Sequence, residues 1–338
     1  MKTPLTELLG IEHPILSAGM GAATGPELAA AVSNAGACGQ VTITGLSAPN
    51  VHRRVEETRA LTAKPFGVNV ILADREEGED EDIRAALELG VPLLVLFWGD
   101  PSPFVQEAHR RGTKVFVQVG SVEEAVAAAG SGVDGVIAQG FEAGGHVRGS
   151  TALFVLLPAV VDAVSPVPVI AAGGIADGRG LAAALTLGAQ GVLMGTRFLA
   201  SDEAFVPREY RDWVVRSTAE DTVYSKDLFD VWWPDAPHRV LRNKGVEEWE
   251  AAGRPPPGGR PGEATVIGSM KRMDGSVVDV PRYCAITITP NFEGDIDKAP
   301  LWAGQSCSLV NEVKPAGEIV RDVARQAEAI LARPTANQ

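Results

Sequence analysis

Residues 169–200 read VIAAGGIADGRGLAAALTLGAQGVLMGTRFLA, and this stretch decides the fold. It contains a short apolar strand, a glycine pair, an alanine-rich helical segment, a second apolar strand and a second glycine turn. Strands without polar residues are typical of parallel sheets that are covered on both faces. Two parallel strands also need a crossover connection, and the helical segment supplies it. The stretch therefore predicts two successive strand–helix units of an α/β protein.

The same alternation of strands and helices begins near residue 13. Eight such units that close on themselves predict a (β/α)8 TIM barrel. An open dinucleotide-binding sheet would need GxGxxG after its first strand and an acidic residue near the end of its second strand. The chain has GMGAATG and Gln40-Val41 at those places, so this alternative is rejected. Strands are expected at Pro14–Ala18, Ala37–Val41, Phe66–Val70, Leu93–Trp98, Lys114–Val119, Gly135–Ala138, Val167–Ala172 and Gly191–Met194, and helices at Pro26–Asn34, Asn50–Leu61, Glu79–Leu89, Ser102–Arg110, Val122–Ala129, Leu153–Ala163 and Gly180–Leu187.

The pattern changes near residue 213, where tryptophans and a GRPPPGGRPG linker (253–262) replace the strand–helix units. We expect a smaller, mainly helical second domain over residues 213–287, inserted near the C-terminus. Residues 1–212 and 288–338 are expected to form the barrel. The tail from Pro315 has apolar residues at helical spacing, so we expect a helix that packs on the outside of the barrel.

The composition narrows the class of protein. The 338 residues are 45% hydrophobic and 22% charged, with a formal net charge of −13 and no Lys/Arg-rich block, which argues against nucleic-acid binding. No apolar stretch is long enough to span a membrane and no signal-peptide pattern is present, so a cytoplasmic protein is expected. Three scattered cysteines indicate neither a disulfide framework nor a zinc site, and no metal is expected. A homodimer is compatible with the sequence, which does not decide the oligomeric state.

Working groups of a TIM barrel lie where its strands end. The seventh strand ends at Gly173-Gly174 and the eighth at Gly195-Thr196. Glycines at these two positions let backbone N–H groups approach a phosphate, and the threonine can add a hydroxyl donor. The first strand ends at Ala18-Gly19-Met20, which faces the same mouth. The spacing therefore predicts a phosphate-bearing ligand at this end of the barrel.

Three amide side chains also follow strands: Asn69, Gln118 and Gln139. Amides both donate and accept hydrogen bonds, which suits the edge of an isoalloxazine ring. Together with the glycine turns they favour flavin mononucleotide (FMN) over a sugar phosphate.

The loop after the sixth strand reads GFEAGGHVRG (140–149) and places His146 over the predicted mouth. An imidazole there can act as a general base or as a donor to an anion. Gly144 and Gly145 are expected to leave room for a ring and a substrate. Glu142 is a candidate to orient the imidazole, although it can equally face solvent. The other four histidines and Cys307 are interpreted as structural or solvent-facing.

These segments resemble the nitronate monooxygenase family, formerly called 2-nitropropane dioxygenases. The resemblance rests on QGFEAGGHVRG (139–149), residues 169–200, LWAGQS (301–306), PILSAGMG and FGVNV. It implies an FMN-dependent oxidoreductase in which O2 oxidises alkyl nitronates, and by extension neutral nitroalkanes, to carbonyl compounds and nitrite. It places His146 at the catalytic position. Flavin contacts are implied for Ala18, Gly19, Met20, Asn69, Gln118, Gln139, Gly144, Gly145, Gly173, Gly174, Gly195 and Thr196.

Other functions remain open at this point. FMN-dependent enoyl-acyl carrier protein reductases share the GGH loop, so an NAD(P)H-dependent enoyl reductase or quinone reductase is the main alternative. A non-catalytic flavoprotein component of a larger assembly is a minor one. An IMP dehydrogenase would need a cysteine after the sixth strand, where residues 139–151 have none. Trp232, Trp233 and Trp302 are expected to form part of the substrate cavity wall or an interdomain core.

Overall fold

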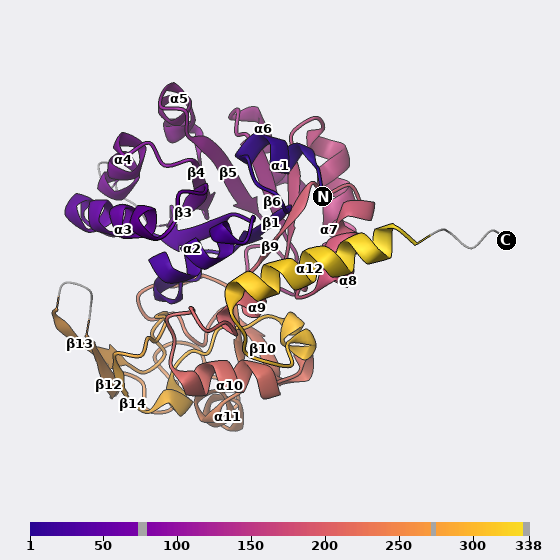
Figure 1. Cartoon of the computed structure of the whole chain (residues 1–338). Coiled ribbons are helices and arrows are strands. Elements are labelled where there is room, and N and C mark those ends of the chain that lie inside the picture. Colours follow the sequence, from indigo (N-terminus) through magenta and orange to yellow (C-terminus); the bar gives the residue numbers. More distant parts are fainter. Residues whose placement is uncertain (74–79, 272–274, 334–338) are drawn as a thin grey trace.

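The computed structural model describes residues 1–73, 80–271 and 275–333. Its largest sheet has eight parallel strands in the order β1-β9-β8-β6-β5-β4-β3-β2 (Figure 1). The sheet closes where the Ser17 N–H donates to the Cys38 carbonyl at 3.1 Å, next to a Leu16–Cys38 bridge. The predicted TIM barrel is therefore confirmed. Its strands are β1 (Ile15–Ser17), β2 (Gly39–Thr42), β3 (Phe66–Ile71), β4 (Leu93–Phe97), β5 (Lys114–Val119), β6 (Gly135–Gln139), β8 (Val169–Ala172) and β9 (Gly191–Met194).

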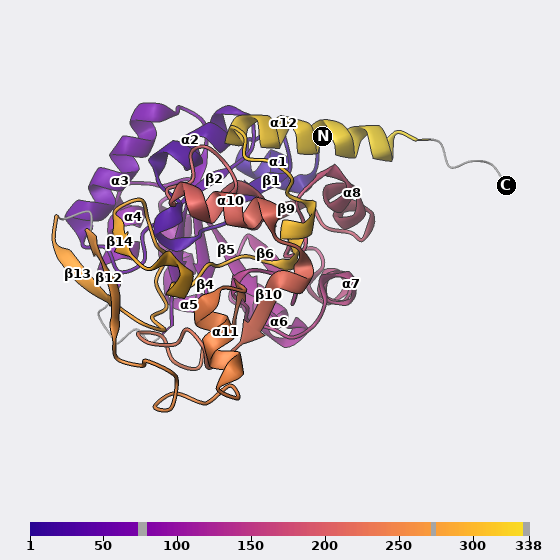
Figure 2. The same ribbon diagram turned by 90° about the horizontal axis from the view of Figure 1, so that it is seen from below.

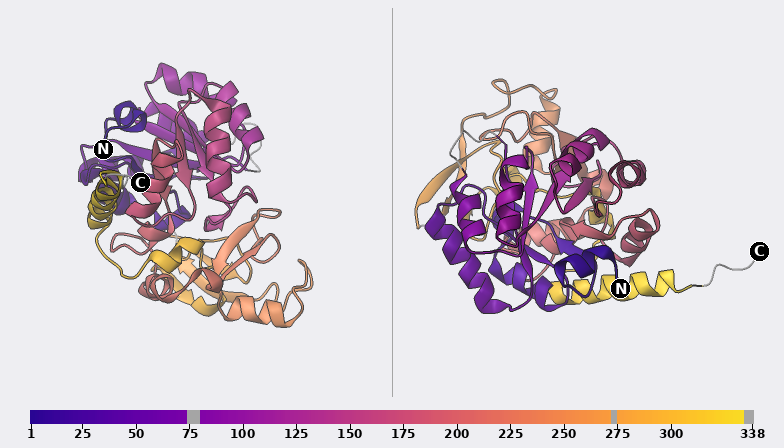
Figure 3. Two further views of the ribbon diagram at one scale, coloured as in Figure 1. Left: turned by 90° about the vertical axis from the view of Figure 1, so that its right-hand side faces the viewer. Right: turned by 90° about the horizontal axis from the view of Figure 1, so that it is seen from above.

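Alternate strand residues separate the barrel interior from the layer beneath the helices. Leu93, Val95 and Phe116 belong to one interior cluster, whereas Leu94 and Leu96 pack in a second cluster with the surrounding helices. Burial on both faces explains why these strands read as continuous apolar runs. The helices around the barrel (Figure 3) are α2 (Pro26–Asn34), α3 (Ala48–Leu61), α4 (Glu81–Glu88), α5 (Ser102–Arg110), α6 (Val122–Gly130), α7 (Leu153–Val164), α8 (Gly178–Thr186) and the short α9 (Thr196–Leu199). Glu79, the expected first residue of the fourth helix, lies outside the described residues.

One N-terminal element was missed from the sequence. Helix α1 (Pro4–Leu9) begins at Thr3, whose side chain accepts from the Thr6 N–H in a capping box. Leu5 and Leu9 join the interior cluster of the barrel, so α1 closes the end opposite to the strand termini. Threonine followed by proline is a helix-start signal that the sequence carried.

The tail forms α12 (Ala316–Leu331), which packs against α8 and α2 on the outside of the barrel. The expected packing of the tail is therefore confirmed. Ile319, Val320 and Val323 are buried, as their helical spacing predicted. No helix within the described parts of the chain is both long and apolar enough to cross a membrane.

The region after α9 is not mainly helical, which corrects the sequence prediction. More of its residues lie in the strands of two three-stranded sheets, β10-β11-β7 and β13-β12-β14, than in its two longer helices. The physical reason is that these strands are short and most of them are partly exposed, so no clear strand pattern was readable among the tryptophan, proline and glycine residues. The elements are α10 (Arg208–Arg216), β10 (Thr222–Ser225), β11 (His238–Leu241), α11 (Lys244–Ala251), β12 (Val266–Lys271), β13 (Val277–Pro281), β14 (Phe292–Gly294) and the strand β7 (Gly145–His146) from the barrel.

This second region lies across the end of the barrel at which the parallel strands terminate (Figure 2). It has an apolar cluster of its own that includes Phe229, Trp249 and Tyr283. The cluster supports a separate unit over residues 213–287, and that boundary stays a prediction. The pairing of β14 with β12 suggests extending the unit to about residue 294.

Candidate active site

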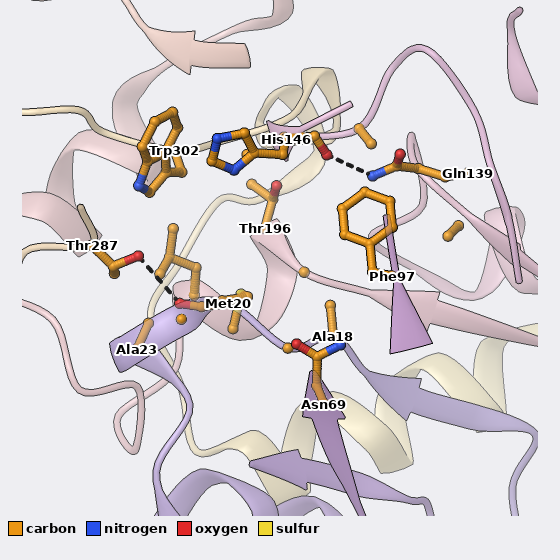
Figure 4. Close-up of a pocket in the computed structure, with 18 of the residues that line it drawn as sticks. Ala18, Met20, Ala23, Asn69, Phe97, Gln139, His146, Thr196, Thr287 and Trp302 are labelled. Atoms are coloured by element: carbon orange, nitrogen blue, oxygen red, sulfur yellow. Dashed lines mark hydrogen bonds between the residues drawn. The ribbon is translucent and has the colours of Figure 1, made fainter. Parts of the chain in front are cut away.

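A cavity of about 360 Å³ lies between the carboxyl ends of the barrel strands and the second region. Figure 4 shows its main side chains, with Asn69 and Ala18 on the barrel side and Trp302 and His146 facing them. All residues that the sequence predicted for the site line this one cavity, although their roles stay predictions. They are Ala18, Gly19, Met20, Asn69, Gln118, Gln139, Gly144, Gly145, His146, Gly173, Gly174, Gly195 and Thr196.

The glycine turn after β8 is required by its backbone. Gly173 has φ +94° and Gly174 has φ +73°, a region that only glycine adopts without strain. A Cβ on Gly173 would also lie 2.9 Å from the Gly140 carbonyl oxygen. The turn therefore exposes backbone to the cavity and lets the loop after β6 pass close behind it.

The hydroxyl of Thr196 lies at the end of β9 and accepts a hydrogen bond from the Gly304 N–H at 2.9 Å. A hydroxyl has one proton and two acceptor positions, so this contact leaves the Thr196 proton free to donate into the cavity. The threonine thus remains a candidate donor to an anionic group.

The three amides lie differently from one another. Asn69 covers Gly19, where a Cβ would lie 2.2 Å from the Asn69 Oδ1. Gln118 lines the cavity, and its amide makes no hydrogen bond to the rest of the described chain. Gln139 instead donates to the His146 carbonyl at 2.9 Å and accepts from the Arg148 N–H at 2.9 Å. Both the NH2 and the C=O of the Gln139 amide therefore hold the loop that carries the histidine, which the sequence interpretation did not foresee.

The two glycines before His146 have different tasks. A Cβ on Gly144 would lie 2.1 Å from the Gly304 nitrogen, so the loop and residues 303–304 touch backbone to backbone. The Gln305 N–H also donates to the Glu142 carbonyl at 2.9 Å. Gly145 has φ +68° and open space beside it. Gly144 is thus a packing requirement, and Gly145 is a conformational one.

His146 lies on β7, which pairs with β11 of the second region. Its ring centroid is 3.8 Å from that of Trp233 and 5.2 Å from that of Trp302. Nε2 is shielded from solvent and has no hydrogen-bond partner among the described residues. Burial lowers the pKa of His146 well below its ordinary value of 6.5, and the neighbouring His238 lowers it further. The imidazole is therefore neutral at physiological pH.

Glu142 does not orient this imidazole. Both of its carboxylate oxygens accept from the Leu153 N–H, at 2.9 and 3.1 Å. Leu153 is the first residue of α7, so the carboxylate satisfies a free N–H at a helix N-terminus. Glu142 therefore has a structural role, in which its carboxylate accepts a hydrogen bond at the start of α7.

Two of the three tryptophans that were expected at the cavity wall line the cavity, and the third lies at the protein surface. Trp233 and Trp302 line the cavity, as expected for a wall, whereas Trp232 is 55% exposed. Trp98 was not foreseen: it follows β4 with φ +67°, and its ring lies 5.3 Å from that of Trp233. A bulky residue with positive φ is rare and tends to mark a functional site. Trp98 lies behind Trp233 and does not itself line the cavity; the lining residues that sequence reasoning missed include Tyr210, Met270, Ile286 and Thr287.

The cavity carries no formal charge apart from the titratable histidine. Among the described residues, no aspartate, glutamate, lysine or arginine lines it. Arg148, two residues after His146, ion-pairs with Glu124 and stacks on Trp98, and it does not line the cavity. The arrangement therefore favours a neutral substrate or a delocalised monoanion held by uncharged donors.

The remaining candidates outside the site are structural. Cys38, Cys284 and Cys307 are free and buried, and burial raises the pKa of the Cys307 thiol to about 11. None of these thiols is therefore a nucleophile at neutral pH. Within residues 1–73, 80–271 and 275–333, no group of three or more His, Cys, Asp or Glu side chains is gathered to hold a metal.

We predict that the burial of His238 makes the folded protein less stable in acid. Its Nδ1 donates to the Ala236 carbonyl and its Nε2 accepts from the Phe229 N–H, and burial lowers its pKa to about 4. Because the folded pKa lies below 6.5, the unfolded chain takes up the proton first as the pH falls. The stabilisation is complete above pH 6.5 and is lost between about pH 6.5 and 4, a total of about 3 kcal/mol.

Urea unfolding of the wild type and His238→Gln at pH 7.5 and pH 5 measures this effect. Between pH 7.5 and pH 5, the free energy of unfolding of the wild type should fall by about 2 kcal/mol more than that of the variant. In this range the His238 side chain takes up its proton in the unfolded chain but not in the folded protein. Equal losses would show that His238 does not cause the acid sensitivity.

The comparisons with known proteins fit this architecture. A family model described as nitronate monooxygenase matches residues 2–326. The chain is 38% identical over 256 residues to (3aS,4S,5R,7aS)-5-hydroxy-7a-methyl-1-oxo-octahydro-1H-indene-4-carboxyl-CoA dehydrogenase of Mycobacterium tuberculosis, covering 75% of this chain and 70% of that protein. The structure of FabK from Thermotoga maritima is similar with a TM-score of 0.80 and 34% identity, over 98% of this chain and 97% of that one.

The structure of nitroalkane oxidase from Streptomyces ansochromogenes is similar with a TM-score of 0.77 and 28% identity, over 97% of this chain and 99% of that one. The family model spans nearly the whole chain, and the two solved structures align with nearly its full length. The chain therefore belongs to the nitronate monooxygenase family and is a flavin-dependent oxidoreductase.

Proposed function

We propose that the chain binds FMN and oxidises alkyl nitronates, and neutral nitroalkanes after removal of their α-proton, with O2 to carbonyl compounds and nitrite. The observation that carries the proposal is a neutral imidazole, His146, in an uncharged cavity lined by aromatic rings. A base with a pKa below the working pH is ready to accept a proton. No lysine or arginine of the described residues lines the cavity, which suits a small substrate of low charge.

The residues present fit a flavin mononucleotide. Backbone N–H groups at Gly173–Gly174 and Gly195, with the Thr196 hydroxyl, offer donors to a phosphate without a lysine or arginine. The unpartnered amide of Gln118 is a donor and acceptor for the edge of the ring system. Asn69 lines the same side of the cavity. When bound, the flavin supplies the acceptor for the electrons of the nitronate.

The proposed work of the chain itself is proton transfer and charge stabilisation. A neutral nitroalkane loses its α-proton to the His146 imidazole, and the C–H electron pair becomes delocalised over the nitro group. The resulting imidazolium lies beside the nitronate and stabilises its negative charge. The faces of Trp233 and Trp302 lie next to the same ring and can stabilise its cationic form. A pre-formed nitronate needs only the stabilisation of its charge.

A single anaerobic experiment tests this function. The purified protein is expected to be yellow and to release FMN, identified by chromatography, on denaturation. Addition of an alkyl nitronate without O2 should bleach the flavin absorbance in the time of one turnover. NADH or NADPH should bleach it far more slowly, since in the proposed reaction the nitronate itself supplies the electrons to the flavin.

The similarity to FabK favours a second candidate, an NAD(P)H-dependent enoyl thioester reductase. Rapid bleaching by NADPH, turnover with enoyl thioesters and no reaction with nitronates would establish that candidate instead. A colourless protein that FMN does not reconstitute would contradict both candidates.

A further inference from the structure

Arg239 is a buried arginine that neither the sequence patterns nor the cavity lining singled out. It lies on β11 with 3% of its surface exposed. Its Nε donates to the Ala143 carbonyl at 3.2 Å and its Nη2 to the Phe141 carbonyl at 2.9 Å. Both carbonyls belong to the loop between β6 and His146. The guanidinium therefore reaches from the second region into the loop of the proposed base.

Packing fixes the plane of this guanidinium. Its third contact is with the Thr222 hydroxyl on β10, at 3.2 Å. It also stacks over the Phe141 ring at 4.8 Å and lies 5.6 Å from the Tyr224 ring centroid. A planar fork held on aromatic faces presents two N–H donors at a fixed spacing to two carbonyls, whereas a lysine ammonium is a single point charge without that fixed geometry.

The backbone joins the same two segments. Gly145 pairs with Arg239 and His146 pairs with His238 in the β7–β11 ladder. The Val147 N–H donates to the Pro237 carbonyl at 2.7 Å. His146 is therefore carried by a barrel loop but is placed by a strand of the second region.

A buried arginine usually forms an ion pair or binds a charged substrate, and neither role explains the burial of Arg239. Within the described residues it forms no ion pair, and it does not line the cavity, so it is not a substrate clamp. Its hydrogen bonds go to two carbonyls and one hydroxyl, all uncharged. Burying a guanidinium on neutral acceptors is costly, and a cost of this kind is retained where it fixes geometry.

We propose that Arg239 is the positioning residue for His146, holding carbonyls 141 and 143 so that the imidazole stays over the cavity. The inference rests on the proposed function only in giving His146 the proton-transfer role. A shift of about 1 Å in a reacting group can cost ~10²-fold in rate. Loss of Arg239 is expected to act mainly on kcat for neutral nitroalkanes, because the cavity that binds the substrate is otherwise intact.

Three variants separate positioning from simple stability. Arg239→Met removes the fork, and Arg239→Lys keeps the charge but loses the fixed spacing of the two donors that hold the carbonyls. Arg282→Met is the matched control, since Arg282 is 5% exposed, lies in the same region, and stacks on Tyr283 at 4.8 Å while pairing with Glu248. We expect kcat on neutral nitroalkanes to fall ~10²-fold in Arg239→Met, less in Arg239→Lys, and little in Arg282→Met.

A measurement that does not depend on turnover completes the test. The pKa of His146 is read by NMR of histidine-labelled protein, with its signal assigned by its loss in His146→Asn. The charged and titratable groups near His146 are His238 and Arg239 on β11, Arg148 beyond β7, Glu142 in the loop and Tyr210 on α10. Arg239→Met should raise this pKa towards 6.5 as water reaches the ring, and Arg239→Lys should raise it as well although the positive charge remains.

The outcomes are distinguishable. An unchanged pKa of His146 in both Arg239 variants, or an equal kcat loss in Arg282→Met, would overturn the positioning role. A shifted pKa in a protein that lacks nitroalkane turnover would uphold Arg239 as the positioning residue while contradicting the proposed reaction. If Arg239→Met does not fold, Arg239→Lys carries both measurements.

Discussion

Replacing His146 with asparagine is expected to lower kcat/KM for neutral nitroalkanes by ~10²–10⁴-fold, the range over which a general base contributes. Asparagine keeps a polar side chain of similar reach but accepts no proton. The pre-formed nitronate has already lost its α-proton, so its kcat/KM should fall much less. Steady-state O2 consumption with both forms of one substrate measures the difference. Equal losses on both forms would make His146 an anion-binding group, and no loss on either would remove it from the mechanism.

The pH dependence gives an independent check on the same residue. Because the pKa of His146 lies well below 6.5, the imidazole stays neutral as the pH falls from 7.5 to 6. The rate on neutral nitroalkanes should therefore be flat over this range in the wild type, once the substrate's own ionisation is taken into account. A histidine of ordinary pKa would lose most of its neutral form by pH 6, and a fall of that size would contradict the buried, neutral state of His146.

The barrel could be predicted from the sequence because its signals are local and repeated. Most strands are largely apolar runs, such as Leu93–Phe97. Several of the helices that follow have a start signal, such as Ser121, whose side chain accepts from the Glu124 N–H. The position of the site followed from the fold, since functional groups of TIM barrels lie at the carboxyl ends of the strands. The residue types at those ends then indicated a flavin.

The contacts of the second region could not be predicted, because they join residues that are distant in sequence. The β7–β11 pairing brings Gly145 beside Arg239, 94 residues later in the chain, and β7 has only two residues. No periodicity is readable in a strand of that length. The same holds for Gln139, whose strand-end position predicted a ligand contact, whereas its amide holds the His146 loop.

The two glycines of the GGH motif could be assigned to the site from the sequence, but the physical reason why each position needs glycine could not. The sequence interpretation gave both glycines the task of leaving room for a ring and a substrate. The structure separates them: Gly145 has open space around its Cα and a positive φ, while Gly144 faces the backbone of residues 303–304. The LWAGQS segment (301–306) was linked to the site only by resemblance, and the contact between Gly144 and Gly304 explains the link.

Gly144→Ala is therefore expected to have the second large effect. Its Cβ would lie 2.1 Å from the Gly304 nitrogen and 2.2 Å from the Ala303 carbonyl carbon, and backbone atoms cannot rotate away as a side chain can. The loop and residues 303–304 must separate by about 1 Å, which moves His146 on one side and Trp302 on the other. Overpacking of this kind costs about 1–3 kcal/mol of stability, and the displacement of His146 should lower kcat/KM by ~10²-fold.

Two glycine controls show whether crowding is the cause. Gly145→Ala meets no protein atom within 4 Å but places alanine at φ +68°, so it should lose about 1 kcal/mol of stability through backbone strain alone. Gly130→Ala, at the end of α6 with open space, should change neither stability nor activity. Thermal unfolding and nitroalkane turnover are measured on all three variants. If Gly144→Ala retains wild-type activity, the backbone contact at Gly304 does not determine the position of His146, and the base must be held by β11 and Arg239 alone.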